Sequence, residues 1–319
     1  MILGHQKQWS FLQKMAASGR IPQALLFSGQ EYLGKKKVAL EFVKLLNCQG
    51  DGGEPCGKCF SCSAFEKGNH PDLLSVAPSP KEIQIGQVRD AQRFLSYTRQ
   101  MAKFKAVIID EAHCLNQEAQ NCLLKTLEEP QPYTVLILVT SLPQALFKTI
   151  LSRCEELKFY PVDGAEMARC FVGHKNNPQW QEILNWSDGR PDLALQFFQD
   201  KDLVKKRISN FQLIENLLNS DLAQRLLLVK DYWAETAGQN KDASEDETDN
   251  SFASLRDFLE NWLFYVRRLL HQKIAGGGSS SDSAMQLVCL LRKIDDLKFL
   301  LLNTNINKRL LLENLVLNL

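Results

Sequence analysis

Short apolar runs alternate with amphipathic segments through the first half of the chain. The runs consist mostly of apolar residues, which suits strands buried inside a sheet. They cover residues 24–28, 73–77, 106–110 and 134–140. Segments with apolar residues at helical spacing lie among them, at residues 35–46, 85–97 and 117–127. This alternation predicts a parallel sheet with helices on both faces, so we expect one α/β domain up to about residue 160.

The pattern changes after residue 160, where strand signals fade and helical spacing dominates. Residues 161–202 have the pattern of short helices, and residues 203–319 contain long amphipathic segments such as 255–272 and 285–303. Two polar segments interrupt them and are predicted to be surface loops. These are the acidic residues 236–250 and the Gly/Ser-rich residues 276–283. We therefore expect three domains, with boundaries near residues 160 and 202.

Composition and charge narrow the class of protein. A chain of 319 residues has enough mass for two or three domains. The net charge of +1 provides no overall basic field for autonomous nucleic-acid binding. The first residues lack the apolar run of a signal peptide, and no stretch of about 18 apolar residues predicts a membrane span. We expect a soluble, cytoplasmic protein with no membrane partner.

The cysteines are concentrated in one short segment. Of nine, four follow the spacing C-x7-C-x2-C-x2-C, at Cys48, Cys56, Cys59 and Cys62. Four thiolates suffice for a closed tetrahedral Zn²⁺ site, which would be structural because it leaves no open coordination position. The alternative is a redox dithiol at Cys56 and Cys59, although no thioredoxin-like pattern surrounds it.

A glycine-rich turn follows the first predicted strand and precedes a helix, which is the context of a phosphate-binding loop. It runs from Gly29 through Gly34 and Lys35 to Lys36. Lys35 stands at the phosphate-binding lysine, but Lys36 replaces the Ser or Thr whose hydroxyl ligates Mg²⁺. The alternative is an ordinary tight turn with surface lysines.

Two acids stand at the C-terminal end of the third predicted strand. In nucleoside triphosphatases of this architecture, an acid at the position of Asp110 supports Mg²⁺ and one at the position of Glu111 polarises the attacking water. The alternative is a helix N-terminus favoured by acidic residues. The tetrapeptide Asp-Glu-Ala-His also occurs in helicases, but the rest of the chain lacks the pattern of a second ATPase lobe.

Arg153 follows Ser152 at the end of a predicted helix. An arginine that projects there can reach a γ-phosphate held by a neighbouring subunit. A lone arginine is more often an ordinary solvated surface residue, so the surrounding motifs decide between the two interpretations.

These elements, in this order, resemble the bacterial DNA polymerase III clamp-loader subunits, a branch of the AAA+ family. Residues 121–130 are similar to the family's N-A-L-L-K-x-L-E-E-P signature, and residues 152–154 match its S-R-C motif, the trans-acting arginine finger. The cysteines match its zinc module. The resemblance, dense over residues 1–160, implies an α/β AAA+ domain with a zinc module inserted at 48–62. A small helical lid domain over 161–202 and an all-α collar domain over 203–319 would follow.

The chain departs from the family's motor subunits at two nucleotide contacts. They carry Thr where this chain has Lys36, and a nucleotide-sensing arginine where it has Asp192, although Arg190 lies nearby. Arg153 is intact. This combination resembles the branch that does not work as an ATPase but completes a neighbour's site, so we expect ATP to bind weakly or not at all. The implied partners are the motor subunits (gamma/tau), the delta subunit, the sliding clamp and primer–template DNA, within a hetero-oligomer.

Two other functions stay open at the level of sequence. Lys35, Asp110 and Glu111 would suit a motor subunit that hydrolyses ATP itself. Lys58 and Lys67, near the cysteines, would suit a zinc-bearing scaffold that contacts DNA or partners.

Overall fold

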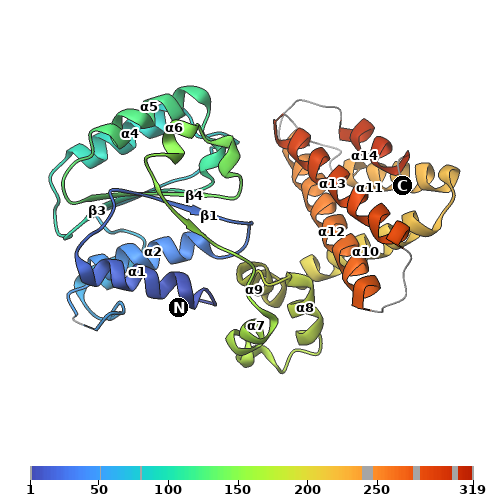
Figure 1. The fold of residues 1–319 in the computed structure, drawn as a ribbon, viewed down its shortest axis with the longest axis horizontal. Coiled ribbons are helices and arrows are strands. Elements are labelled where there is room, and N and C mark those ends of the chain that lie inside the picture. Colours follow the sequence, from blue (N-terminus) through green and yellow to red (C-terminus); the bar gives the residue numbers. More distant parts are fainter. Residues whose placement is uncertain are drawn as a thin grey trace. The chain divides into compact units, whose positions relative to one another are not determined.

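The structure is a computed structural model that describes residues 2–50, 52–79, 81–238, 247–275, 281–303 and 308–317. The chain forms two compact units, Met1–Phe198 and Gln199–Leu319 (Figure 1). The first unit contains the predicted α/β domain and most of the predicted lid. The division into three domains stays a prediction.

A parallel five-stranded sheet organises the described part of the first unit. Its strand order is β2-β3-β4-β1-β5. The strands are β1 (Ala24–Ser28), β2 (Leu73–Val76), β3 (Lys105–Ile109), β4 (Thr134–Thr140) and β5 (Glu155–Lys158). The predicted strands are confirmed within one residue at each end. Strand β5, which is mostly exposed and pairs with β1 at the sheet edge, is not among the predicted elements.

Helices cover both faces of the sheet, as the sequence predicts (Figure 1). One face carries α1 (Gln6–Ser18) and α2 (Lys35–Leu46), and the other carries α4 (Ile85–Ser96), α5 (Gln117–Glu128) and α6 (Lys148–Leu151). Neighbouring residues of β1 serve opposite cores, because side chains alternate along a strand. Leu25 and Phe27 pack in the core with α1 and α2, whereas Leu26 packs in the core with α4 and α5. Each such buried side chain contributes about 1.5–3 kcal/mol through the hydrophobic effect.

Three further helices of the first unit enclose a small core around Met167 and Phe171. They are α7 (Gly164–Cys170), α8 (Trp180–Ser187) and α9 (Pro191–Gln199). Gly189 joins α8 to α9 with φ +69°, and a Cβ there would lie 2.4 Å from the Val162 carbonyl oxygen. Only glycine fits this close approach, which brings the start of α9 back beside the segment that leaves the sheet.

The second unit is a bundle of helices around Trp262, Phe258 and Leu259 (Figure 1). Its helices are α10 (Lys201–Asn219), α11 (Leu222–Gly238), α12 (Glu247–Ala275), α13 (Ser281–Asn303) and α14 (Lys308–Leu317). None of the helices in the described ranges has an apolar stretch long enough to cross a bilayer.

The two predicted loops of this unit are too long. Helix α11 continues to Gly238 and α12 begins at Glu247, so the loop prediction over 236–250 is wrong at both ends. Likewise, α13 begins at Ser281, inside the predicted loop over 276–283. The central residues, 239–246 and 276–280, lie outside the described residues. Composition marks a polar segment but does not fix where the flanking helices end, because helix ends depend on capping and packing.

The remaining short elements connect these parts and include the helix that carries the cysteines. They are α3 (Phe60–Glu66) and the 3₁₀ turns η1 (Ala112–Cys114), η2 (Pro143–Ala145) and η3 (Val172–His174).

Candidate functional site

The glycine-rich loop lies between β1 and α2, where the sequence places it. Gly29 has φ +146°, and a Cβ on it would lie 2.4 Å from the Phe159 carbonyl oxygen. Gly34 caps α2 in the left-handed region with φ 84°, and Tyr32 also has a positive φ, 62°. The backbone therefore keeps the tight turn of a phosphate loop.

Lys35 is buried and turns back onto its own loop. Its Nζ donates hydrogen bonds to the carbonyl oxygens of Gly29, at 2.7 Å, and Gln30, at 2.5 Å. Burial lowers the pKa of Lys35 to about 8, against the opposing effect of nearby carboxylates such as Glu31 and Asp110. In this structure the lysine expected to contact phosphate binds loop carbonyls.

Lys36 forms an ion pair with Asp110 across the sheet edge. Its Nζ lies 2.9 Å from Asp110 Oδ2. The carboxylate that the sequence assigns to Mg²⁺ support is thus paired with the ammonium that replaces the Mg²⁺-binding hydroxyl. Mg²⁺ requires oxygen ligands, so this donor set does not fit a magnesium ion.

Helix α9 contacts the loop through the position where motor subunits carry an arginine. The Asp192 backbone N donates to the Tyr32 carbonyl oxygen at 3.0 Å, and Lys37 Nζ lies 2.6 Å from Asp192 Oδ1. Arg190 is buried and donates through Nε to the Ser187 carbonyl oxygen. Sequence reasoning missed the Asp192–Lys37 pair, for which the opposite charges were the available signal.

His5 supports the loop from the N-terminal segment. Its Nε2 lies 2.8 Å from the Leu33 carbonyl oxygen, and its ring meets Phe159 edge-on at 5.1 Å between centroids. Burial lowers the pKa of His5, which favours the neutral imidazole. A cavity of about 750 Å³ lies beside it, lined by Tyr160, Glu166 and neighbouring residues.

Arg153 lies two residues after the end of α6 and contacts α5. Its Nη2 is 2.9 Å from Glu128 Oε1, and its Nη1 donates to the Thr149 carbonyl oxygen at 3.0 Å. The side chain is about one-third exposed, at 36%. Glu128 belongs to the signature over residues 121–130, but the sequence did not indicate this pairing.

Arg153 lies at the N-terminal ends of the parallel strands, whereas the phosphate loop lies at their C-terminal ends. The cavity of about 410 Å³ at Arg153 is lined by the first residues of three strands, namely Ala24, Thr134 and Glu155. The phosphate loop instead follows Ser28, the last residue of β1. The length of β1, about 13 Å, separates these two ends of the sheet. The structure thus brings Lys35, Lys36 and Asp110 together but does not place Arg153 with them.

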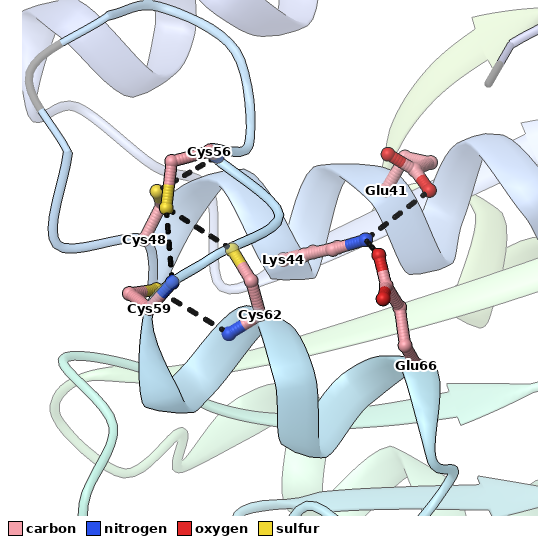
Figure 2. A network of polar contacts seen from close by, with 7 residues as sticks. All are labelled: Glu41, Lys44, Cys48, Cys56, Cys59, Cys62 and Glu66. Carbon is pink, nitrogen blue, oxygen red and sulfur yellow. Dashed lines mark hydrogen bonds and ion pairs between the residues drawn. The ribbon is translucent and has the colours of Figure 1, made fainter.

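The four clustered cysteines converge as the spacing predicts (Figure 2). The Sγ atoms of Cys48, Cys56, Cys59 and Cys62 all lie within 4.8 Å of one another. Backbone N–H groups point at the sulfurs: Cys56 N lies 3.3 Å from Cys48 Sγ, and Cys62 N lies 3.4 Å from Cys59 Sγ. The donor set therefore fits a tetrahedral metal ion.

The surroundings of the cluster favour thiolate at some positions and hold the segment in place. Backbone hydrogen bonds from Lys58 and Cys59 lower the pKa of Cys56, whereas burial raises the pKa of Cys62 to about 12. A bound metal ion would have to displace the Cys62 proton. Lys44 Nζ lies 2.8 Å from Glu66 Oε1, and this ion pair links α2 to α3 beside the cluster (Figure 2).

A second group of metal-ligating side chains lies just after β3. Glu111, His113 and Cys114 bring a carboxylate oxygen, an imidazole nitrogen and a thiol within 4.8 Å of one another. The sequence analysis identified Glu111 but not the other two.

Comparison with known proteins places these features in a family. Residues 4–163 match the family model described as DNA polymerase III, delta subunit. The chain is 31% identical over 214 residues to DNA polymerase III subunit delta' of Bacillus subtilis, covering 67% of this chain and 65% of that protein. It is also 31% identical over 226 residues to subunit delta' of Pseudomonas aeruginosa, covering 68% and 67%.

Other relatives match over a smaller part of their length. Subunit tau/gamma of Haemophilus influenzae is 35% identical over 169 residues, which is 53% of this chain and 24% of that protein. The chain therefore spans just under two thirds of the Bacillus subtilis relative and about a quarter of tau/gamma.

A solved structure has a similar fold. It is the crystal structure of a DNA polymerase III gamma subunit-related protein from Thermotoga maritima, with a TM-score of 0.51 and 21% identity, covering 97% of both chains. At this identity the likeness supports the fold alone.

Proposed function

This chain belongs to the delta' family of DNA polymerase III subunits, the clamp-loader family that the sequence resembles, and we propose that it is a non-hydrolysing member that lends Arg153 to a neighbouring ATPase subunit. The observation that carries this proposal is the position of Arg153 at the N-terminal ends of the strands, away from the phosphate loop at their C-terminal ends. A guanidinium there serves a nucleotide only when a second subunit supplies one.

The state of the chain's own loop supports the non-hydrolysing part of the proposal. Lys36 removes the hydroxyl ligand of Mg²⁺ and pairs with Asp110 at 2.9 Å. Phosphoryl transfer relies on Mg²⁺ to position and neutralise the phosphates, so loss of its ligands removes the main source of catalysis. Retention of Lys35 alone does not replace it.

The contacts of Arg153 leave its guanidinium accessible to a phosphate group of a neighbouring subunit. Glu128 holds the guanidinium at 2.9 Å while leaving it partly exposed. A γ-phosphate of the neighbour would offer oxygens for the same planar donor groups. The arginine would then stabilise the charge that spreads over the phosphoryl oxygens during transfer.

The partners follow from the same assignment. We expect this chain to assemble with gamma/tau motor subunits and a delta subunit into a hetero-oligomer. That assembly would open a sliding clamp and load it on primer–template DNA. The helical second unit supplies the collar through which the subunits associate.

The cysteine cluster completes the proposal as a structural Zn²⁺ site. Cys48, Cys56, Cys59 and Cys62 would hold the ion, which would join the end of α2 to the start of α3. The closed set of four thiolates leaves no position for a reacting water.

Substitution of Arg153 tests the proposed function. In a complex reconstituted with motor subunits, Arg153→Ala should abolish hydrolysis at the one site that it completes, because arginine fingers contribute about 10³–10⁵ in kcat. The measurement is the clamp- and DNA-stimulated ATPase rate of the complex, with size-exclusion chromatography to verify assembly. Arg169→Ala, on α7, is the matched control. An unchanged ATPase rate in an assembled Arg153→Ala complex would contradict the proposal.

A further inference from the structure

We propose that Glu111, His113 and Cys114 form a second transition-metal site, with Zn²⁺ as the ion that their chemistry favours. Their ligand atoms lie within 4.8 Å of one another on and beside the turn η1, which directly follows β3. Cys114 Sγ lies 4.0 Å from Glu111 Oε2. This group is separate from the four cysteines.

The local backbone brings the three side chains to one side. Glu111 takes the left-handed conformation with φ 47°, and the Cys114 N donates to the Glu111 carbonyl oxygen at 2.8 Å. This tight turn brings Glu111 close to His113 and Cys114. Glu111 is exposed and His113 and Cys114 are partly exposed, so their side chains can make the shifts of up to about 1.5 Å that would bring ligand atoms from within 4.8 Å to coordination distance.

A contact with the neighbouring strand orients the imidazole. His113 Nδ1 lies 3.4 Å from Thr140 Oγ1, and Thr140 is buried at the end of β4. When Nδ1–H donates to this hydroxyl, the lone pair is on Nε2. Metal-binding histidines commonly have such a partner on their second nitrogen, because it fixes the tautomer and the ring orientation.

The donor types select the class of ion. A thiolate and an imidazole prefer Zn²⁺ or a similar transition metal over Mg²⁺ and Ca²⁺, which take oxygen ligands. Tetrahedral coordination with bonds of about 2.0–2.3 Å places ligand atoms about 3.3–3.8 Å apart, slightly closer than the 4.0 Å between Cys114 Sγ and Glu111 Oε2. Three protein ligands leave one position for water.

The site has a consequence for the degenerate nucleotide centre. Glu111 is the carboxylate that would polarise the attacking water in an ATPase, and coordination would commit it to the metal ion. The preceding residue, Asp110, already forms an ion pair with Lys36. The two acids would then be neutralised separately, one by an ammonium and one by a soft metal ion. This inference does not depend on the role of Arg153.

Metal content of the full chain tests the proposal. Each protein is equilibrated with micromolar Zn²⁺ and separated from free metal by gel filtration. Inductively coupled plasma mass spectrometry should then find one more zinc ion per chain in the wild type than in Cys114→Ser or His113→Ala. Cys122→Ser is the matched control, because Cys122 lies outside both clusters, and it should retain the wild-type content. Circular dichroism verifies that each variant is folded.

A second measurement separates this site from the cysteine cluster. Co²⁺ added to wild type that holds one equivalent of Zn²⁺, which fills the four-cysteine cluster and leaves the second site open, should produce a thiolate-to-cobalt charge-transfer band that is lost in Cys114→Ser and kept in Cys122→Ser. Equal zinc content in wild type and Cys114→Ser, or a cobalt band that survives Cys114→Ser, would overturn the proposal.

Discussion

Lys36 places an ammonium beside the carboxylate that would otherwise support a metal ion. The pair with Asp110 is half-exposed on the lysine side, so its contribution to stability is at most about 1 kcal/mol. Its importance is chemical, because one side chain both removes a Mg²⁺ ligand and neutralises another.

Restoring the hydroxyl should partly restore the nucleotide site. We expect Lys36→Thr to strengthen Mg²⁺-dependent ATP binding by about tenfold, equivalent to about 1.4 kcal/mol, because it supplies a ligand and frees Asp110. Isothermal titration calorimetry of the isolated chain, with and without Mg²⁺, measures the change. Lys37→Thr, which disturbs only the pair with Asp192, should give no such Mg²⁺-dependent gain.

Asp72 is a buried carboxylate with a structural role. It accepts backbone hydrogen bonds from residues 100–102 just before β3. Burial alone would raise the pKa of Asp72, but the backbone N–H donors and Lys105 outweigh it and lower the pKa. The folded state therefore binds this proton less readily than the unfolded chain.

The sign of this shift sets a pH dependence. Asp72 should contribute stability above pH of about 4, near its unfolded pKa, and this contribution should disappear as pH falls through the lower folded pKa. Asp72→Asn should reduce the free energy of unfolding by about 2 kcal/mol at pH 7. It should also flatten the acid decline in urea titrations. Asp90→Asn, at an exposed site, is the control; equal effects of the two substitutions would contradict the assignment.

At the scale of elements, helix α9 is attached to the phosphate loop by two different contacts. One is the backbone hydrogen bond from Asp192 N to the Tyr32 carbonyl oxygen, and the other is the ion pair of Asp192 with Lys37. Both contacts are made within the chain.

Removing the ion pair should loosen the loop slightly. Asp192→Ala keeps the backbone contact but loses a partly exposed pair worth about 0.2–1 kcal/mol, so amide exchange over residues 29–37 should accelerate about two- to fivefold. Hydrogen–deuterium exchange with mass spectrometry measures it. Asp202→Ala breaks a comparable pair with Lys205 on α10 and should leave the loop unchanged. Unaltered exchange in Asp192→Ala would show that the ion pair does not restrain the loop.

Some strands and helices can be predicted from the local sequence pattern, and others cannot. Strands such as β4 are continuous apolar runs, so periodicity finds them directly. Strand β5 has the sequence Glu-Glu-Leu-Lys and becomes a strand because it pairs with β1 at the sheet edge, a long-range effect that local pattern does not contain. Helix α1 was also missed, although Trp9, Leu12 and Met15 form a buried stripe at helical spacing.

At the scale of the whole molecule, the two units have separate hydrophobic cores. Trp262 is fully buried in the second unit and packs edge-on against Phe258 at 5.4 Å. The first unit is organised around its sheet. Two cores of this kind favour two unfolding transitions in place of one.

A core substitution in one unit should therefore affect one transition. Trp262→Ala should destabilise the second unit by about 3–5 kcal/mol through lost burial and a cavity. Differential scanning calorimetry should show one transition moved to lower temperature and the other unchanged. Tyr97→Ala, an exposed aromatic of the first unit, should move neither. A joint shift of both transitions would indicate one cooperative unit.

The sequence by itself determined the parallel α/β architecture, the helical second half, the cysteine cluster and the candidate residues Lys35, Lys36, Asp110 and Arg153. These features depend on local periodicity, spacing and side-chain chemistry, which a single chain displays along its length. The tertiary structure decided which of these residues meet. It paired Lys36 with Asp110, Arg153 with Glu128 and Asp192 with Lys37, and it placed Arg153 at the far edge of the sheet. Such contacts join residues distant in sequence, so they follow only from how the strands and helices pack.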